Sequence, residues 1–174
     1  MTAFPDPLLS FAQQPDLVLA ALTCYGEARG EPSLGKKGVL WAIKNRCQAA
    51  KDRLGRGHGN HPLFGDGSVA SAVLKPYQFS CWLKGDPNLA VLSLAVESAG
   101  RSVPAGVWAV IYALAEKVWE EEPVADPTWG STHYCTAGLW ETPDTLAWYG
   151  KPEIEAGRTV EKVKLGNHVF AKVA

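Results

Sequence analysis

A glutamate near the end of a helical pattern is the most suggestive chemical feature of this chain. Glu27 lies in the stretch Cys24-Tyr-Gly-Glu-Ala-Arg-Gly-Glu-Pro32. A carboxylate at a helix end that is partly withdrawn from water can have its pKa raised toward neutrality, and it can then act as a general acid. Glycosidases that cut polysaccharide backbones protonate the leaving oxygen with such a group. Glu27 is therefore the first candidate for a catalytic residue.

Two other acidic residues compete with Glu27 or could support it. Glu31 follows four residues later and would share a face with Glu27 if the helix continued. Gly30 and Pro32 instead predict that the helix has ended, so we expect Glu31 to bond backbone amides of the next helix or to pair with a nearby arginine. Asp126 is a candidate second carboxylate, although Asp beside a proline in a turn commonly makes local hydrogen bonds.

The hydrophobic pattern predicts that helices position these groups. Residues 1–15 hold three prolines and are expected to form an irregular arm, and residues 16–174 a single domain. Apolar residues recur at helical spacing from about Asp16, a plausible N-cap, to Gly30. Further helices are predicted over 33–47, 68–74, 88–99 and 107–121. A surface loop is predicted over 51–68, and an extended segment over 77–82. The chain is expected to be irregular from 123 to 135 and to form a hairpin over 160–173. The fold class is α+β and mainly helical.

Composition limits the classes of function. The chain has 174 residues and a formal net charge of −1, so it has no surplus of Lys and Arg to neutralise nucleic-acid phosphates. No stretch approaches the roughly 20 apolar residues needed to cross a bilayer. The first residues lack the basic and apolar regions of a secretory signal. We expect synthesis in the cytoplasm, no nucleic-acid or membrane partner, and a monomer.

The cysteines and histidines do not indicate a metal site. The four cysteines are far apart and include no Cys-x-x-Cys pair, so buried reduced thiols are expected. His58 and His61 lie in a Gly-rich loop, and no His-Glu-x-x-His pattern occurs. We predict neither a metal nor a cofactor.

Three ordered blocks resemble the SleB/CwlJ-type cell wall hydrolases, a family that includes spore cortex-lytic enzymes and phage relatives. The blocks are 25–46, the Gln-Phe-Ser motif within 74–80, and 126–134, and the ending at 166–170 is similar to a Gly-x-His-x-Phe pattern. The resemblance implies a lysozyme-like fold and peptidoglycan as the substrate. It also implies cleavage of the MurNAc–GlcNAc bond by lytic transglycosylation, which leaves 1,6-anhydro-MurNAc.

The resemblance implies that Glu27 is the acid of this reaction. Glu27 would protonate the glycosidic oxygen and then accept the proton of the MurNAc C6 hydroxyl, which attacks C1. Gln78 and Ser80 are expected to bind the sugar near the acid, since side chains two residues apart on an extended segment point the same way. Tyr77 and Trp82 are possible stacking platforms for sugar rings.

The third block supplies a second predicted substrate-binding group. It consists of Thr132, His133 and Tyr134, of which Tyr134 could hydrogen-bond the acid or the acetamido group. His133 could do the same or could pair with Asp126. Nearby aromatic residues would belong either to a saccharide groove or to a satellite core; they are Trp129, Trp140, Trp148 and Tyr149.

The predicted setting is that of a phage or prophage endolysin, released through a holin or carried by the virion. Three alternatives remain open. Water could replace the C6 hydroxyl, which would make the protein a hydrolytic muramidase. The protein could be a peptidoglycan amidase or peptidase, which would need a metal or a Cys/His pair. It could also be a non-catalytic lysozyme-like module of a phage particle that binds glycan without turnover.

Overall fold

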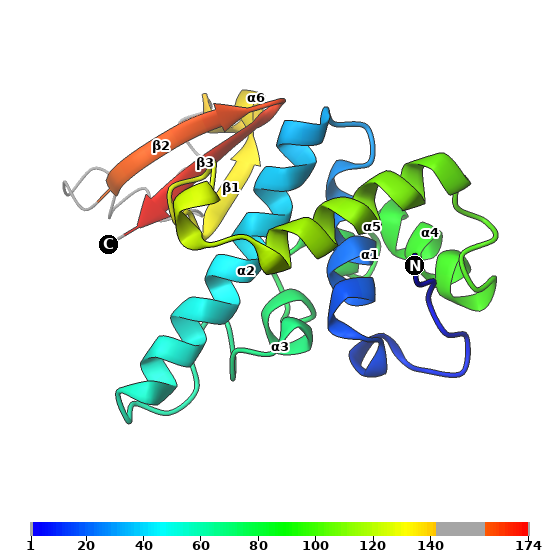
Figure 1. Ribbon diagram of the computed structural model, residues 1–174, viewed down its shortest axis with the longest axis horizontal. Coiled ribbons are helices and arrows are strands. Elements are labelled where there is room, and N and C mark those ends of the chain that lie inside the picture. Colours follow the sequence, from blue (N-terminus) through cyan, green and yellow to red (C-terminus); the bar gives the residue numbers. More distant parts are fainter. Residues whose placement is uncertain (1, 142–158, 174) are drawn as a thin grey trace.

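The computed structural model describes residues 2–141 and 159–173. Helices α1, α4 and α5 gather at one end of the molecule, a three-stranded sheet lies at the other, and α2 runs along the sheet (Figure 1). In chain order, the elements are η1 (Phe11–Gln13), α1 (Asp16–Ala28), α2 (Ser33–Gly55), α3 (Val69–Val73), η2 (Ser80–Trp82), α4 (Pro87–Glu97), α5 (Ala105–Glu120), η3 (Pro123–Ala125), β1 (His133–Thr136), α6 (Ala137–Trp140), β2 (Thr159–Leu165) and β3 (His168–Val173).

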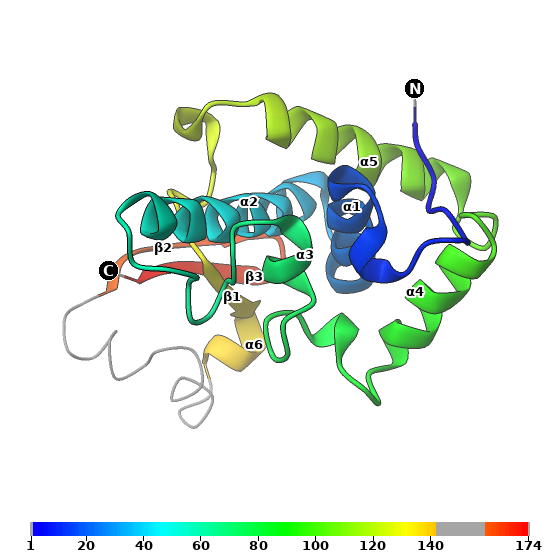
Figure 2. The same ribbon diagram turned by 90° about the horizontal axis from the view of Figure 1, so that it is seen from below.

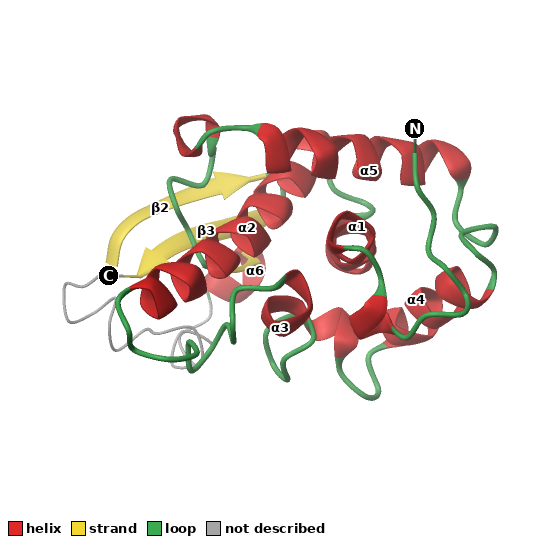
Figure 3. Ribbon diagram, turned by 60° about the horizontal axis from the view of Figure 1, so that its bottom comes forward, coloured by secondary structure: helices red, strands yellow, loops and turns green. Residues whose placement is uncertain are grey.

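Helix α1 is the centre of the hydrophobic core. Figure 3 shows it nearly end-on, with α3, α4 and α5 around it. Its residues from Val18 to Cys24 are buried on all sides, and all of them except Thr23 are apolar, as expected for a helix at the centre of a core. The predicted N-cap was wrong, because Pro15 precedes the helix and Asp16 is its first residue. There the carboxylate still stabilises the helix, since negative charge is favoured in the first turn.

Helix α2 is longer than predicted. It continues to Gly55, so the first residues of the expected 51–68 loop are helical. The extension consists of good helix formers, and Gln48 Nε2 donates a hydrogen bond to Asp52 Oδ1 (2.7 Å) across one turn. Helical propensity therefore outweighs the Gly-rich composition until Gly55.

The N-terminal segment packs against the helices. The Phe4 ring stacks on Trp108 of α5 with the ring centroids 6.1 Å apart, and Trp108 Nε1 donates to the Ala3 carbonyl (2.9 Å). Gln14 is buried and binds the backbone of Asp6 through both ends of its amide. The division of the chain near residue 15 stays a prediction.

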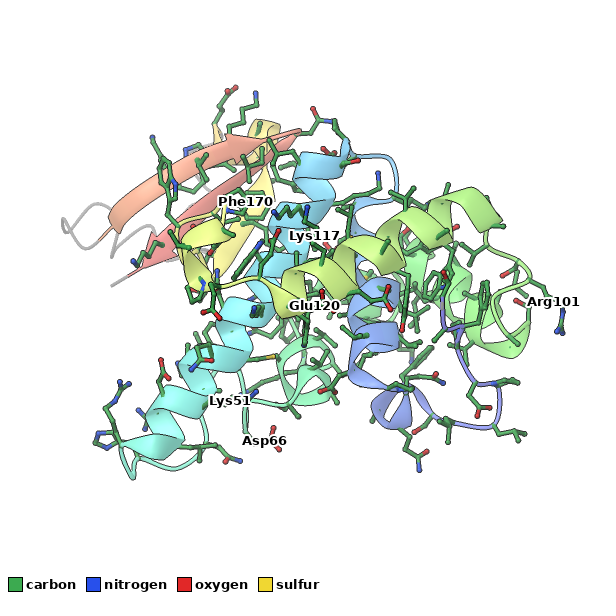
Figure 4. All side chains as sticks on the ribbon, in the orientation of Figure 1. Lys51, Asp66, Arg101, Lys117, Glu120 and Phe170 are labelled. Carbon is green, nitrogen blue, oxygen red and sulfur yellow. The ribbon has the colours of Figure 1, made fainter. Side chains whose placement is uncertain are left out.

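The sheet has the strand order β1-β3-β2, and both pairs are antiparallel. The predicted hairpin is present as β2 and β3, whereas β1 lies in a segment that was predicted to be irregular. Phe170 of β3 packs between the sheet and α2 (Figure 4). Gly38 makes this possible, because a Cβ at that position would lie 2.6 Å from Phe170 Cζ. The fold class, α+β and mainly helical, is confirmed.

The segment from Tyr77 to Trp82 is compact, and the prediction of an extended segment was wrong. Gln78 N–H donates to the Lys75 carbonyl (3.2 Å), and residues Ser80–Trp82 form the 3-10 helix η2. The reason lies in the tertiary structure, because η2 packs against α1 and continues directly into the turn before α4.

Candidate active site

A cleft of about 420 Å³ opens beside the end of α1. On one side stands the segment between α3 and α4, and on the other side stand β1 and α6, which Figure 2 shows next to that segment. The lining residues are Glu27, Arg46, Leu63, Tyr77, Gln78, Ser80, Leu83, His133, Tyr134, Cys135, Thr136, Leu139 and His168. The cleft thus brings together parts of all three sequence blocks.

Glu27 is held in the cleft by donors from two separate elements. Its Oε1 accepts hydrogen bonds from the Cys81 backbone N–H (2.8 Å) and the Ser80 hydroxyl (3.2 Å). Its Oε2 accepts a bond from the Tyr134 hydroxyl (3.1 Å). These donors fix the plane of the carboxyl group while its side chain stays half-buried at the cleft surface. A carboxyl group held in this way can exchange a proton with a bound substrate.

The residue before Glu27 explains how η2 comes so close to the Glu27 carboxylate. Gly26 has no side chain, and a Cβ built there would lie 2.7 Å from Cys81 Cβ. The absence of that atom lets the η2 backbone reach the carboxylate. Trp82 Nε1 adds a second attachment, since it donates to Thr23 Oγ1 (3.2 Å) one turn earlier on α1.

Tyr134 is positioned by the sheet. It pairs with Phe170 across β1 and β3, and the two rings stack with centroids 5.3 Å apart. Burial raises the pKa of Tyr134 well above its usual value, and the negative charge of Glu27 adds to this effect. The hydroxyl therefore stays protonated at neutral pH and acts as a hydrogen-bond donor to Glu27.

Arg46 connects the two walls of the cleft. Its Nε donates to the Thr132 carbonyl (2.7 Å) just before β1, and its Nη1 donates to the Gln78 carbonyl (2.9 Å) on the opposite side. The guanidinium also lies over the Phe79 ring, 4.4 Å from its centroid. Both walls are thus attached to one residue of α2, a role that the position of Arg46 at the end of the first sequence block did not reveal.

Two neutral histidines line the cleft. Burial lowers the pKa of His133 to about 4, and the positive charge of Arg46 contributes. Burial also lowers the pKa of His168, although Glu31 and Glu27 oppose that shift. His168 was part of a sequence motif but had been given no role. Its ring meets the Tyr134 ring edge to face, with centroids 5.3 Å apart.

The other predicted substrate-binding residues divide into two groups. Gln78, Ser80, His133 and Tyr134 line the cleft, as does the predicted platform Tyr77. Thr132 is not among the described lining residues, and its Oγ1 lies 2.9 Å from His133 Nδ1. The second platform, Trp82, lines a neighbouring hollow instead of the cleft.

Glu31 holds the hairpin against the helices. Its Oε2 accepts a bond from the Asn167 backbone N–H (2.8 Å), and its Oε1 accepts one from Asn167 Nδ2 (3.1 Å). The expected partners on the next helix or on a nearby arginine are therefore replaced by the β2–β3 turn. Gly35 and Gly166 leave room for this carboxylate, because a Cβ at either position would crowd Oε2.

Asp126 organises the loop before β1. It is 6% exposed, and its carboxylate accepts bonds from Thr128 N–H (2.7 Å), Gly130 N–H (2.7 Å) and Asn45 Nδ2 (2.9 Å). These partners replace the expected pairing with His133. Asp126 does not line the described part of the cleft, so its geometry fits a bracing function and not that of a second catalytic carboxylate.

Of the other aromatic residues that were singled out, Trp129 and Trp140 are not among the described lining residues of the cleft. Trp129 is 53% exposed in the Asp126 loop. Trp140 lies in α6, and the Lys162 ammonium is 5.6 Å from its ring centroid. Trp148 and Tyr149 lie outside the described residues. Several lining residues were not recognisable beforehand, because apolar side chains such as Leu63 and Leu139 carry no chemical signal.

Neither a metal cluster nor a membrane-spanning helix is found in the described part of the chain. Within residues 2–141 and 159–173, no group of three or more His, Cys, Asp or Glu side chains could hold an ion. No helix in these ranges is long and apolar enough to cross a membrane. All four cysteines are free and buried.

The comparison with known families gives this site its context. The family model described as Cell Wall Hydrolase matches residues 30–171. The chain belongs to the cell wall hydrolase family. The matched range of this hydrolase includes the second and third blocks and most of the closing hairpin, and it begins just after Glu27. The membership confirms the resemblance seen in the three sequence blocks.

Two individual proteins are similar to this cell wall hydrolase. One is a spore cortex-lytic enzyme of Halalkalibacterium halodurans, 28% identical over 158 residues that cover 89% of this chain and 34% of the relative. The chain thus spans about one third of that relative's length. The other is the solved catalytic domain of the germination-specific lytic transglycosylase SleB from Bacillus anthracis. Its TM-score is 0.54 at 20% identity, with coverage of 90% of this chain and 93% of that domain. The match shows the lysozyme-like fold that was expected.

Proposed function

We propose that this cell wall hydrolase cleaves the MurNAc–GlcNAc bonds of peptidoglycan as a lytic transglycosylase, with Glu27 as its acid and base. The observation that carries the proposal is the Glu27 carboxylate, held at the cleft surface by Ser80, Cys81 and Tyr134. Family membership supports peptidoglycan as the substrate. The names of the two similar proteins, a cortex-lytic enzyme and a lytic transglycosylase, support a reaction on the glycan strand.

The proposed reaction needs one carboxyl group. Protonated Glu27 gives its proton to the glycosidic oxygen as the bond from C1 of MurNAc to that oxygen breaks, which frees the GlcNAc hydroxyl. The C6 hydroxyl oxygen of the same MurNAc bonds to C1 and releases its proton to the Glu27 carboxylate. The acid is thereby regenerated, the product is 1,6-anhydro-MurNAc, and no water is consumed.

The described lining of the cleft fits this reaction. Glu27 is the only Asp or Glu among those lining residues, whereas hydrolytic glycosidases generally use two carboxylates. The Tyr134 hydroxyl keeps the carboxyl group oriented through both proton transfers. Gln78 and His133 offer polar groups for the substrate's amide and hydroxyl groups, and the neutral state of His133 lets its ring accept as well as donate.

A digest of purified peptidoglycan, analysed by mass spectrometry, tests the proposal. The unsubstituted protein should release anhydro-muropeptides, and Glu27→Gln should lower kcat by about a thousandfold, since general acid–base catalysis contributes about 10² to 10⁴. Glu31→Gln is the matched control because it makes the same chemical change four residues further along the chain, outside the cleft lining. Its kcat should stay within about twofold, because the hydrogen bonds to Asn167 stabilise the fold and do not enter the reaction.

The products separate the alternatives. Reducing-end MurNAc would mean that water competes with the C6 hydroxyl and that the protein is a muramidase. Free stem peptides would indicate an amidase or peptidase, and glycan binding without any product would indicate a non-catalytic module. The endolysin-type setting and the monomeric state stay predictions.

A further inference from the structure

A second hollow adjoins the cleft. Its volume is about 370 Å³, and Tyr77 and Leu83 line both spaces, so the two are neighbours on one surface. The remaining lining residues are Leu74, Lys75, Pro76, Trp82 and Lys84. A substrate seated at Glu27 can therefore extend past Tyr77 into this second space, which we call the lysine hollow.

The backbone of Tyr77 is unusual at this boundary. Its φ is 66°, in the left-handed region that non-glycine residues seldom adopt. The ring is 70% exposed, so burial of the side chain does not account for this conformation. Residues held in such conformations are concentrated at binding sites, where the backbone directs a side chain to a required position. Here the conformation places an aromatic ring between the two spaces.

The lysine hollow is positively charged. Lys75 and Lys84 line it, and none of the described lining residues is Asp or Glu. Lys75 Nζ donates to the Pro62 carbonyl, which orients this ammonium group and leaves its other protons for a further acceptor. Lys84 is exposed, and it forms no ion pair with the described residues. The hollow is thus suited to an anionic group on a substrate that also occupies the cleft.

The geometry points to the carboxylates of the peptide stem as the ligand of the lysine hollow. This inference rests on the proposed function. The stem leaves muramic acid through the lactyl group on C3, two ring atoms from the C1 at which the bond is cut, and it carries free carboxylates. Muramic acid whose stem has been removed by an amidase keeps only the lactyl carboxylate, which lies next to the sugar ring, and the lactam form has no free carboxylate. Neither form therefore carries a charge as far from the ring as the stem carboxylates do. The hollow therefore makes the chain select glycan that carries peptide stems.

The test compares two substrates and three variants. Peptidoglycan with its stems, and the same glycan stripped of stems by an amidase, are digested while the initial rate of anhydro-muropeptide or anhydro-glycan release is measured. Lys84→Met and Lys75→Met each remove one charge from the hollow. Arg101→Met removes the same charge from the α4–α5 loop, outside the lining of both spaces. Figure 4 shows the Arg101 side chain in solvent, at the end of the molecule opposite the sheet.

The inference expects kcat/KM to be about tenfold higher on the substrate with stems. Each lysine variant should lower kcat/KM on that substrate by about two- to fivefold, in the range of exposed charge pairs, and leave the stripped substrate unchanged. Arg101→Met should alter neither value. Raising the salt concentration should reduce the preference of the unsubstituted protein and should affect Lys84→Met less.

Two results would overturn the inference in distinguishable ways. Equal rates on both substrates, or an equal loss on both in the lysine variants, would exclude stem recognition by the hollow and leave the proposed glycan cleavage intact. No glycan cleavage of either substrate would refute the proposed function and the inference together.

Discussion

Replacement of Gly26 by alanine tests how the site is built. The added Cβ would lie 2.7 Å from Cys81 Cβ and 3.0 Å from Cys81 Sγ, whereas ordinary contacts begin at 3.4 Å. Cys81 must therefore retreat from α1 by about 0.7 Å. Overpacking of this kind costs about 1–3 kcal/mol. Alanine in a helix recovers about 1 kcal/mol relative to glycine. The expected net loss in the free energy of unfolding is about 0–2 kcal/mol.

The effect on catalysis should be larger than the effect on stability. The Cys81 N–H lies 2.8 Å from Glu27 Oε1, and a retreat of about 0.7 Å would place it at the limit of a hydrogen bond. Hydrogen bonds to charged groups contribute about 1.5–3 kcal/mol. If the loss of this hydrogen bond raises the activation free energy by the same amount, kcat falls by about ten- to a hundredfold.

The assay pairs the rate of anhydro-muropeptide release with urea unfolding of the same preparation. Gly30→Ala is the control, because a Cβ there meets nothing within 4 Å and should leave the rate unchanged. Gly26→Ala with an unaltered rate would refute the view that the approach of η2 to α1 sets the position of the acid. A parallel collapse of rate and folding would attribute the loss to misfolding.

Three further results are expected. Tyr134→Phe should lower kcat by about tenfold with little loss of stability, because it removes one bond to Glu27 and keeps the stacked ring; an unchanged rate would show that the hydroxyl is dispensable. Burial holds the pKa of His133 at about 4, below its usual value near 6.5, so the unfolded chain binds more protons between these values. The contribution of neutral His133 to the free energy of unfolding should be complete above about pH 6.5 and should be lost as the pH falls through about 4. Between these pH values, the free energy of unfolding measured with urea should depend less steeply on pH for His133→Gln than for the unsubstituted protein. Burial raises the pKa of Cys24 to about 12, and the other cysteines are also buried, so iodoacetamide at neutral pH should leave the folded protein active, whereas inhibition would favour a cysteine-dependent enzyme.

Local signals were enough to predict helices α1 to α5 and the hairpin, although not the full length of α2 or the short helix α6. Helix α1 was recognisable because its burial follows from the spacing of its own apolar residues. The turn at Gly166 was equally recognisable, because its φ of 62° is one that glycine adopts readily. Errors arose where distant contacts decide the backbone. Strand β1 has only four residues and is stabilised by its pairing with β3. No alternation of apolar and polar residues in the sequence therefore predicted it.

The sequence by itself determined the family, the fold class and the choice of Glu27 as the candidate acid, because these follow from residue types at fixed local spacing. The tertiary structure alone decided which other residues meet that acid. Ser80 and Tyr134 reach Glu27 from segments far apart in the chain, and Glu31 binds Asn167 of the hairpin instead of entering the cleft. The physical reason is that hydrogen bonds and close contacts depend on how whole elements pack. The missing side chains at Gly26 and Gly38 allow η2 and β3 to pack closely against α1 and α2.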